Sequence, residues 1–154
     1  MQEAYSACSG EKGIAREPLK KDTGKRELLV RDVMHLGVLT CKVDTPLCEV
    51  AQMMTDNKVH CVVVVDEVGE ACGVISDLGL LQAYGRDIAS MKAEDVLKGC
   101  TIAVQPTATV QEAVAEMTAK HVHHLVILGE HPLHRPVGIL AASDIVREMA
   151  KGCR

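Results

Sequence analysis

The sequence lacks tryptophan and phenylalanine, and its aromatic side chains are those of Tyr5 and Tyr84. Proteins that bind single-stranded nucleic acid present aromatic rings on which bases stack, and this chain has almost none. Positive charge is also in the minority, because the formal net charge is -4 at pH 7. Such a chain is poorly suited to neutralise a phosphate backbone. We therefore expect no nucleic-acid partner.

Long apolar runs are absent too. No segment approaches the ~20 apolar residues that a membrane-spanning helix needs. Residues 1–10 have neither the basic start nor the apolar stretch of a signal peptide. The seven cysteines are odd in number and scattered, and several lie within apolar strand patterns. Free cysteines behave as small buried hydrophobic residues in a reducing compartment. We expect a cytoplasmic protein without a membrane segment.

Motifs for catalysis are missing. The chain has no Gly-x-Ser-x-Gly turn around a nucleophile and no glycine-rich phosphate loop. It also has no Cys-x-x-Cys pair and no His-Glu-x-x-His helix, the spacings typical of zinc sites. We therefore expect a protein that is not an enzyme, with no bound metal and no tightly held cofactor.

What the sequence does contain is an internal repeat. Residues 47–65 align with residues 110–128 at an offset of 63, and six of these 19 pairs are identical. The same offset aligns residues 30–34 with 93–97. Two copies indicate a duplicated unit rather than a solenoid, which needs more repeats to bury its faces. We expect a flexible leader over residues 1–27, a first domain over 28–88 and a second over 89–154.

Each copy predicts the same elements, in the order β-α-β-β-α. A short strand (residues 38–43 or 101–105) leads to a proline-containing turn and an amphipathic helix. In the second copy Thr109 and Glu112 have the spacing of a capping box at the start of that helix. Unbroken apolar runs at 62–65 and 125–128 are typical of strands covered on both faces. A further strand ends at Ser76 or Ala141, and a last helix follows it. The fold class is α/β (α+β).

This order, the repeat length and one motif resemble the cystathionine β-synthase (CBS) domain family, which occurs in tandem pairs. The family's motif joins a strand to a helix and reads Gly-apolar-apolar-(Thr/Ser)-x-x-(Asp/Asn)-apolar. The second copy reads Gly138-Ile139-Leu140-Ala141-Ala142-Ser143-Asp144-Ile145, and the first reads Gly73-Val74-Ile75-Ser76-Asp77-Leu78-Gly79-Leu80. The resemblance covers residues 28–151 and implies two repeats packed as a pseudo-twofold pair.

The resemblance also implies a ligand site. In the family the hydroxyl and the carboxylate of this motif bind the ribose and phosphate of AMP, ATP or a similar adenosyl compound. A carboxylate can accept hydrogen bonds from both ribose hydroxyls, and a helix N-terminus offers N–H groups to phosphate. On this chain the ribose would bind Asp144, beside Ala141 and Ser143, and the base would lie near Ile102 and Ala103.

Both copies depart from the motif. The first keeps the hydroxyl, as Ser76, and has Gly79 in place of the carboxylate. The second keeps the carboxylate, as Asp144, and has Ala141 in place of the hydroxyl. Losing a charged acceptor removes more binding energy than losing one hydroxyl, so the second copy is the better candidate.

Histidines form one further group. His121, His123 and His124 lie close together, with His131 and His134 in the next loop. On a strand, His121 and His123 would share a face and His124 would point away. His123 or His124 could meet a phosphate, as a basic residue near this strand does in the family. A transition-metal site and plain solvated side chains are the alternatives.

Three functions follow from these observations. The first is a regulatory module that binds an adenosyl ligand (AMP, ADP, ATP or S-adenosylmethionine) and modulates a separate, unidentified partner protein. The second is an interaction scaffold with degenerate ligand sites, and the third is a metal-binding protein built on the histidines. Because pairs of the family commonly dimerise through their helices, we also expect a homodimer.

Overall fold

The structure, a computed structural model, describes residues 26–97, 102–129 and 134–153. The predicted leader therefore lies outside the described residues, except for its last two. The elements in chain order are α1 (Val30–Val33), β1 (His35–Leu36), β2 (Thr40–Lys42), α2 (Leu47–Asn57), β3 (Cys61–Val65), β4 (Ala71–Ser76), α3 (Asp77–Leu81), α4 (Ala93–Val96), β5 (Ala103–Val104), α5 (Val110–Lys120), β6 (His124–Leu128), β7 (Pro136–Ala141) and α6 (Ala142–Lys151).

The predicted mixed α/β fold with two β-α-β-β-α copies is confirmed. The first copy is β2-α2-β3-β4-α3 and the second is β5-α5-β6-β7-α6. In each, the first strand pairs in parallel with the second, which pairs antiparallel with the third. The partners Thr40–Val63 and Ala103–Val126 occupy equivalent registers at the offset of 63. No helix within the described ranges is long and apolar enough to cross a membrane.

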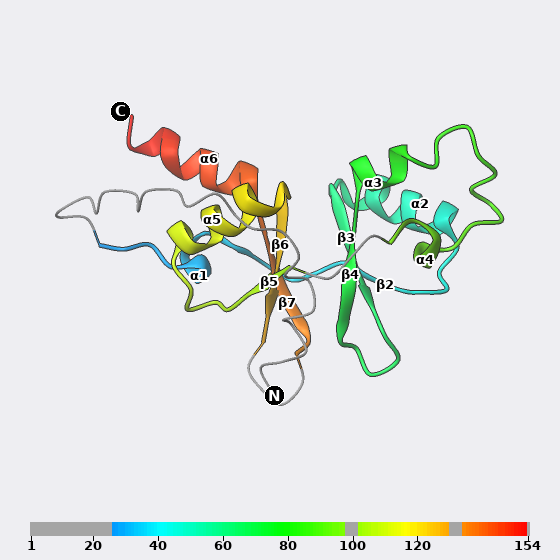
Figure 1. Ribbon diagram of the computed structural model, residues 1–154, viewed down its shortest axis with the longest axis horizontal. Coiled ribbons are helices and arrows are strands. Elements are labelled where there is room, and N and C mark those ends of the chain that lie inside the picture. Colours follow the sequence, from blue (N-terminus) through cyan, green and yellow to red (C-terminus); the bar gives the residue numbers. More distant parts are fainter. Residues whose placement is uncertain (1–25, 98–101, 130–133, 154) are drawn as a thin grey trace.

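The two sheets face each other, and the helices cover their outer sides (Figure 1). This arrangement explains the unbroken apolar strands. On β3, Val62 and Val64 pack into the core under the helices of their own unit. Val63 points the other way and packs with Val126 and Leu128 of the second sheet. All five side chains are at most 4% exposed, so both faces of each central strand are buried.

The capping box predicted for the second copy is confirmed. The backbone N–H of Glu112 donates to the Thr109 hydroxyl at 3.1 Å, and the N–H of Thr109 donates to the Glu112 carboxylate at 2.8 Å. These bonds satisfy two donors that the first turn of α5 leaves without helical partners.

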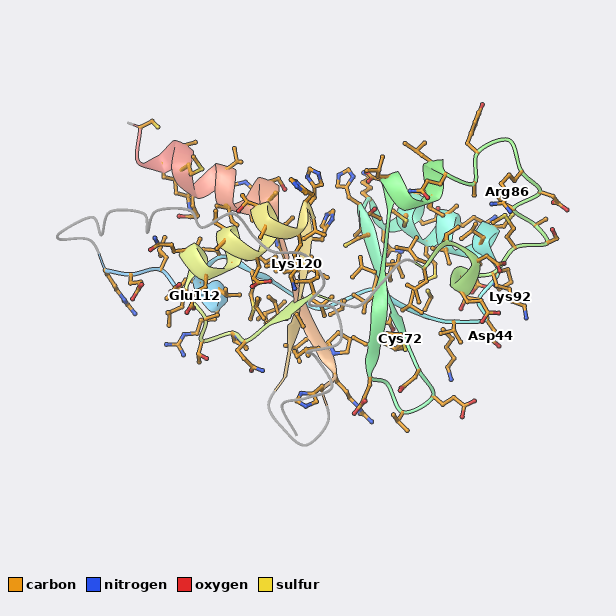
Figure 2. All side chains as sticks on the ribbon, viewed as in Figure 1. Asp44, Cys72, Arg86, Lys92, Glu112 and Lys120 are labelled. Carbon is orange, nitrogen blue, oxygen red and sulfur yellow. The ribbon has the colours of Figure 1, made fainter. Side chains whose placement is uncertain are left out.

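The short first helices of the two copies are exchanged between the units. Helix α1 packs against α5 and α6 of the second unit, with Val30 fully buried there. Strand β1 extends the second sheet, which has the order β1-β7-β6-β5. Conversely, the N–H of Ala93 in α4 donates to Thr45 O at 2.8 Å, and Ala93 belongs to the first core. Lys92, the residue that precedes α4, lies beside Asp44 of the first unit (Figure 2).

The exchange explains the glycine that opens the motif in each copy. A Cβ atom on Gly138 would lie 2.5 Å from the backbone oxygen of His35 in β1. A Cβ atom on Gly73 would lie 2.5 Å from Cδ1 of Leu97, just after α4. A larger residue at Gly138 would therefore push away backbone received from the other copy, and one at Gly73 would displace the side chain of Leu97.

Candidate ligand-binding site

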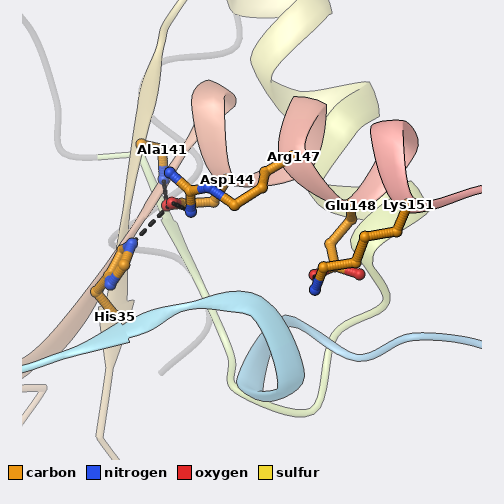
Figure 3. A network of polar contacts seen from close by, with 6 residues as sticks. All are labelled: His35, Ala141, Asp144, Arg147, Glu148 and Lys151. Atoms are coloured by element: carbon orange, nitrogen blue, oxygen red, sulfur yellow. Dashed lines mark hydrogen bonds and ion pairs between the residues drawn. The ribbon is translucent and has the colours of Figure 1, made fainter.

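Asp144 is the one buried charged side chain among the described residues. It occupies the first turn of α6, directly after β7, and is 3% exposed. Its Oδ2 accepts a hydrogen bond from the backbone N–H of Ala141 at 2.9 Å. Its Oδ1 accepts from His35 Nε2 at 2.7 Å and from Arg147 Nη1 at 3.1 Å (Figure 3). The carboxylate therefore caps its own helix and also contacts the exchanged strand β1.

These contacts keep Asp144 ionised. Burial by itself would raise the pKa of the carboxyl group. The hydrogen bond from Ala141 N–H opposes this effect, as do the contacts with His35 and Arg147, and the net pKa lies below its ordinary value. A buried carboxylate with three donors is a strong acceptor that carries full negative charge at neutral pH.

Asp144 lies on the side of the second sheet where the chain crosses between units. The register pairs His35 with Ile139, so the His35 side chain projects from the face of Ile139, which packs at the junction of the two sheets. Only residues 37–39 separate β1 in the second sheet from β2 in the first. The carboxylate thus contacts the strand that leads into this crossing segment, and the segment continues into β2, an edge strand of the first sheet.

Ile102 and Ala103 lie elsewhere. They belong to β5 and its approach, at the opposite edge of the same sheet, with β6 and β7 in between. Strand spacing puts β5 roughly 10 Å from β7. A pocket of about 240 Å³ lies against Ile102 and Ala103, and its lining includes Gln105, Glu116, Lys120 and His134 but not Asp144. Lys120, the last residue of α5, is labelled in Figure 2 and is one of these lining residues. Asp144 is therefore not among the residues that line the pocket beside Ile102 and Ala103.

In the first copy, the predicted hydroxyl caps a helix. Ser76 Oγ accepts a hydrogen bond from the backbone N–H of Gly79 at 3.2 Å and so starts α3. A Cβ atom on Gly79 would meet only Ser76 Oγ, at 3.7 Å, so the position has room for a side chain. In the second copy, Ala141 makes its contact through its backbone alone, and Ser143 is exposed.

The histidines do not form one strand face, so the expectation for His121 and His123 is wrong. His121 ends α5 in the left-handed conformation, with φ 53°, and the strand begins only at His124. Lys58 plays the same part at the end of α2, with φ 54°. In both copies the helix therefore ends in a residue with left-handed backbone, and in the second copy that residue is His121, which cannot belong to the strand.

His124 is the histidine at the junction between units. It pairs with Ala141 across β6 and β7, and burial lowers its pKa below the ordinary value. The negative charge of Asp77, from the first unit, acts in the opposite direction. His123 is exposed, and its backbone oxygen accepts from Ala142 N–H at 2.8 Å. His131 lies outside the described residues. Within the described ranges, no three His, Cys, Asp or Glu side chains are placed to hold a metal ion.

Two site residues were missed by sequence reasoning. Arg147 follows Asp144 by three positions on a helix, a spacing that does signal a contact. His35 is 109 positions away from Asp144, and only the exchange of β1 brings the two together.

Comparison with known proteins agrees with the fold. The family model of the CBS domain matches residues 30–86 and 93–151. The uncharacterized protein MK0525 of Methanopyrus kandleri is 26% identical over 125 residues, which are 79% of this chain and 63% of that protein. The chain therefore spans less than two thirds of this relative.

Solved structures resemble the chain at lower identity. The CBS domain pair of protein MJ0100, in complex with 5′-methylthioadenosine and S-adenosyl-L-methionine, has a TM-score of 0.75 and 19% identity, covering 82% of this chain and 99% of that one. The CBS-domain protein ATU1752 of Agrobacterium tumefaciens has a TM-score of 0.69, 22% identity and coverage of 79% and 98%. Hypoxic Response Protein I, with two coordinated zinc ions, has a TM-score of 0.66, 24% identity and coverage of 77% and 97%.

Proposed function

Since this chain belongs to the CBS domain family, as a tandem pair, we propose that it binds an adenosyl ligand and regulates a separate protein. Pairs of this family are generally regulatory modules rather than catalysts, and no catalytic family is indicated for this chain. The observation that carries the proposal is the ionised, buried carboxylate of Asp144 beside the segment that crosses between the units.

The proposed ribose contact is Asp144, as the motif implies. The proposed base contact moves to Leu39 and Thr40, which are the repeat equivalents of Ile102 and Ala103 at the offset of 63. Leu39 is the last residue of the crossing segment and Thr40 is the first of β2, at the edge of the first sheet, whereas Ile102 lies at the other edge of the second sheet. An aliphatic residue at a strand edge suits a flat base in a chain with few aromatic rings.

A second, weaker position is proposed at the other edge of the second sheet, where Ile102 and Ala103 border the pocket of about 240 Å³. Its motif partner would be the first copy, Ser76 and Gly79. With glycine in place of the carboxylate, a ribose there loses its charged acceptor. His123 and His124, at the N-terminal end of β6, are proposed to contact the phosphate or another polar group of a ligand at either position.

The adenosyl class is supported by similarity to the MJ0100 domain pair, which was solved with 5′-methylthioadenosine and S-adenosyl-L-methionine. Ligand between two packed sheets would favour one relative arrangement of the units over another. Regulation of a partner follows when the partner binds the two arrangements with different affinity.

Titration calorimetry with AMP, ATP, 5′-methylthioadenosine and S-adenosylmethionine tests the proposal. We expect at least one of these compounds to bind. Asp144→Asn should weaken its binding by about 1–3 kcal/mol, because asparagine can cap the helix but lacks the second, charged oxygen that accepts hydrogen bonds from hydroxyl groups. Asp95→Asn is the matched control, since the Asp95 carboxylate caps α4 through Lys92 N–H at 2.8 Å. Equal affinity of wild type and Asp144→Asn would show that the ligand does not contact this carboxylate.

If none of the four compounds binds, the interaction scaffold becomes the better function. Both motif copies are incomplete, which is the observation that favours it. Metal analysis of the purified protein addresses the third alternative.

Assembly and location complete the proposal. We propose a homodimer formed through the outer helices, where grooves lined largely by apolar side chains run between α2 and α3 and between α5 and α6. We also propose a reducing, cytoplasmic setting. Cys41 and Cys61 are free and buried, and burial raises the pKa of each thiol to about 11, which keeps them protonated and unreactive.

A further inference from the structure

The side chains of His35 and Arg147 cover the buried carboxylate of Asp144, and each donates a hydrogen bond to it. Oδ1 accepts from both His35 and Arg147, whereas Oδ2 is taken by the helix cap. The carboxylate is 3% exposed, but the side chains of His35 and Arg147 are 65% and 63% exposed. The oxygen that could accept from a ligand is therefore covered by side chains whose outer parts are in solvent (Figure 3).

His35 can leave without any movement of its strand. The backbone of β1 is fixed to β7 by the pairs His35–Ile139 and Leu36–Gly138 and by the bond from Gly37 N–H to Val137 O at 3.0 Å. The close approach of Gly138 to His35 O adds to this. The imidazole itself is mostly in solvent, so rotation about its side-chain bonds uncovers Oδ1 at little steric cost.

His35 and Arg147 are also carried by different elements. Arg147 is carried by α6, the helix of Asp144 itself, and stays with the carboxylate whatever the two units do. His35 is carried by the exchanged strand, two residues before the segment that crosses to the first unit. It makes the shorter contact, 2.7 Å against 3.1 Å. Of the two side chains, His35 is the one on the strand that leads to the first unit.

We propose that His35 blocks the ligand-accepting oxygen of Asp144 in the free protein and is displaced when a ligand with neighbouring hydroxyls binds. This inference rests on the proposed function and adds a residue that sets its affinity. A ribose offers two O–H donors, so it can replace the single N–H donor of the imidazole. The measured affinity is then the intrinsic affinity multiplied by the fraction of free molecules in which His35 is turned away from Asp144.

The test compares four proteins by calorimetry, with 5′-methylthioadenosine as the probe: wild type, His35→Ala, His35→Gln and Lys151→Ala. Alanine removes the blocking donor and keeps the backbone of β1. Glutamine keeps an N–H donor of similar reach. Lys151 is a matched control, because it is an exposed cation on α6 that pairs with Glu148 and not with Asp144 (Figure 3).

We expect His35→Ala to bind the probe roughly tenfold more tightly than wild type, the gain that follows when a blocked state is removed. His35→Gln should restore an affinity near that of wild type, and Lys151→Ala should leave it unchanged. Binding by His35→Ala alone would also support the blocking role. Equal or weaker binding by His35→Ala, with the wild type binding, would overturn this inference and leave the proposed function standing. Absence of 5′-methylthioadenosine binding by all four proteins would overturn this inference. The proposed function would fall as well only if AMP, ATP and S-adenosylmethionine also failed to bind.

Discussion

At the residue scale, the fixed charge of Asp144 has a consequence for stability. Its pKa in the folded protein lies below the ordinary value, because hydrogen bonds to Ala141, His35 and Arg147 outweigh the effect of burial. A group with a lowered folded pKa contributes stability that is complete above its unfolded pKa. That contribution is lost as the pH falls through the folded pKa.

We therefore predict that Asp144→Asn changes the pH dependence of folding. The free energy of unfolding of the wild type should fall as the pH drops below about 4, the region where an unfolded aspartate titrates. The variant should lose less over this range, since asparagine does not titrate. Urea unfolding at pH 6 and pH 3 measures the difference, and Asp77→Asn, at a carboxylate 59% exposed, is the control. Parallel losses in wild type and Asp144→Asn would contradict the lowered pKa.

The site residues divide into those that local sequence reveals and those that it does not. Asp144 and Ser76 follow from the motif, because a strand-to-helix junction needs a capping acceptor there and the spacing shows it. The grouping of Asp144 with Ile102 stays a prediction, because the pocket beside Ile102 does not include Asp144 in its lining. The contact of His35 with Asp144 depends on the exchanged strand, which no local pattern encodes.

At the element scale, the repeats show which helices and strands an apolar pattern can predict. Apolar periodicity located the main helices and strands of both copies, since each buries one or two faces in a core. Helices α1 and α4 have four residues each, too few to show a periodic face. Their partners are decided by tertiary packing, so the sequence repeat could align them without showing that they are exchanged.

Because of the exchange, alanine should lower the free energy of unfolding by different amounts at the equivalent glycines Gly138 and Gly73. In Gly138→Ala the new Cβ meets the backbone oxygen of His35 at 2.5 Å, and a strand must move. In Gly73→Ala it meets the tip of Leu97, which can rotate. We expect Gly138→Ala to lower the free energy of unfolding by about 1–3 kcal/mol, the range for overpacking, and Gly73→Ala to cost clearly less. Urea unfolding of both variants decides, and equal costs would show that β1 yields as readily as a side chain.

At the scale of the whole molecule, the outer helices leave apolar surface uncovered. The inner faces of the two sheets bury each other through Val63 and Val126, so these apolar side chains are not open to a partner. On the outside, large apolar side chains stay in solvent on both sides of the pair: Leu78 and Leu81 on α3, and Val146 and Met149 on α6, each between 61% and 66% exposed. Apolar surface gathered in this way is typical of an interaction site.

We predict that this surface joins two copies of the chain. Because the two units are related by a pseudo-twofold arrangement, a second molecule can cover both helix faces with the same patch, as closed dimers do. Sedimentation velocity at micromolar concentration should show a dimer for wild type and a monomer for the double variant Val146→Glu, Met149→Glu. Val68→Glu is the control, because Val68 is 56% exposed but lies in the turn between β3 and β4, away from the helices. It should remain dimeric, and circular dichroism should report the same helix content for all three proteins. A wild-type monomer at these concentrations, or a dimer that survives both glutamates, would mean that the exposed helix faces do not hold the assembly together.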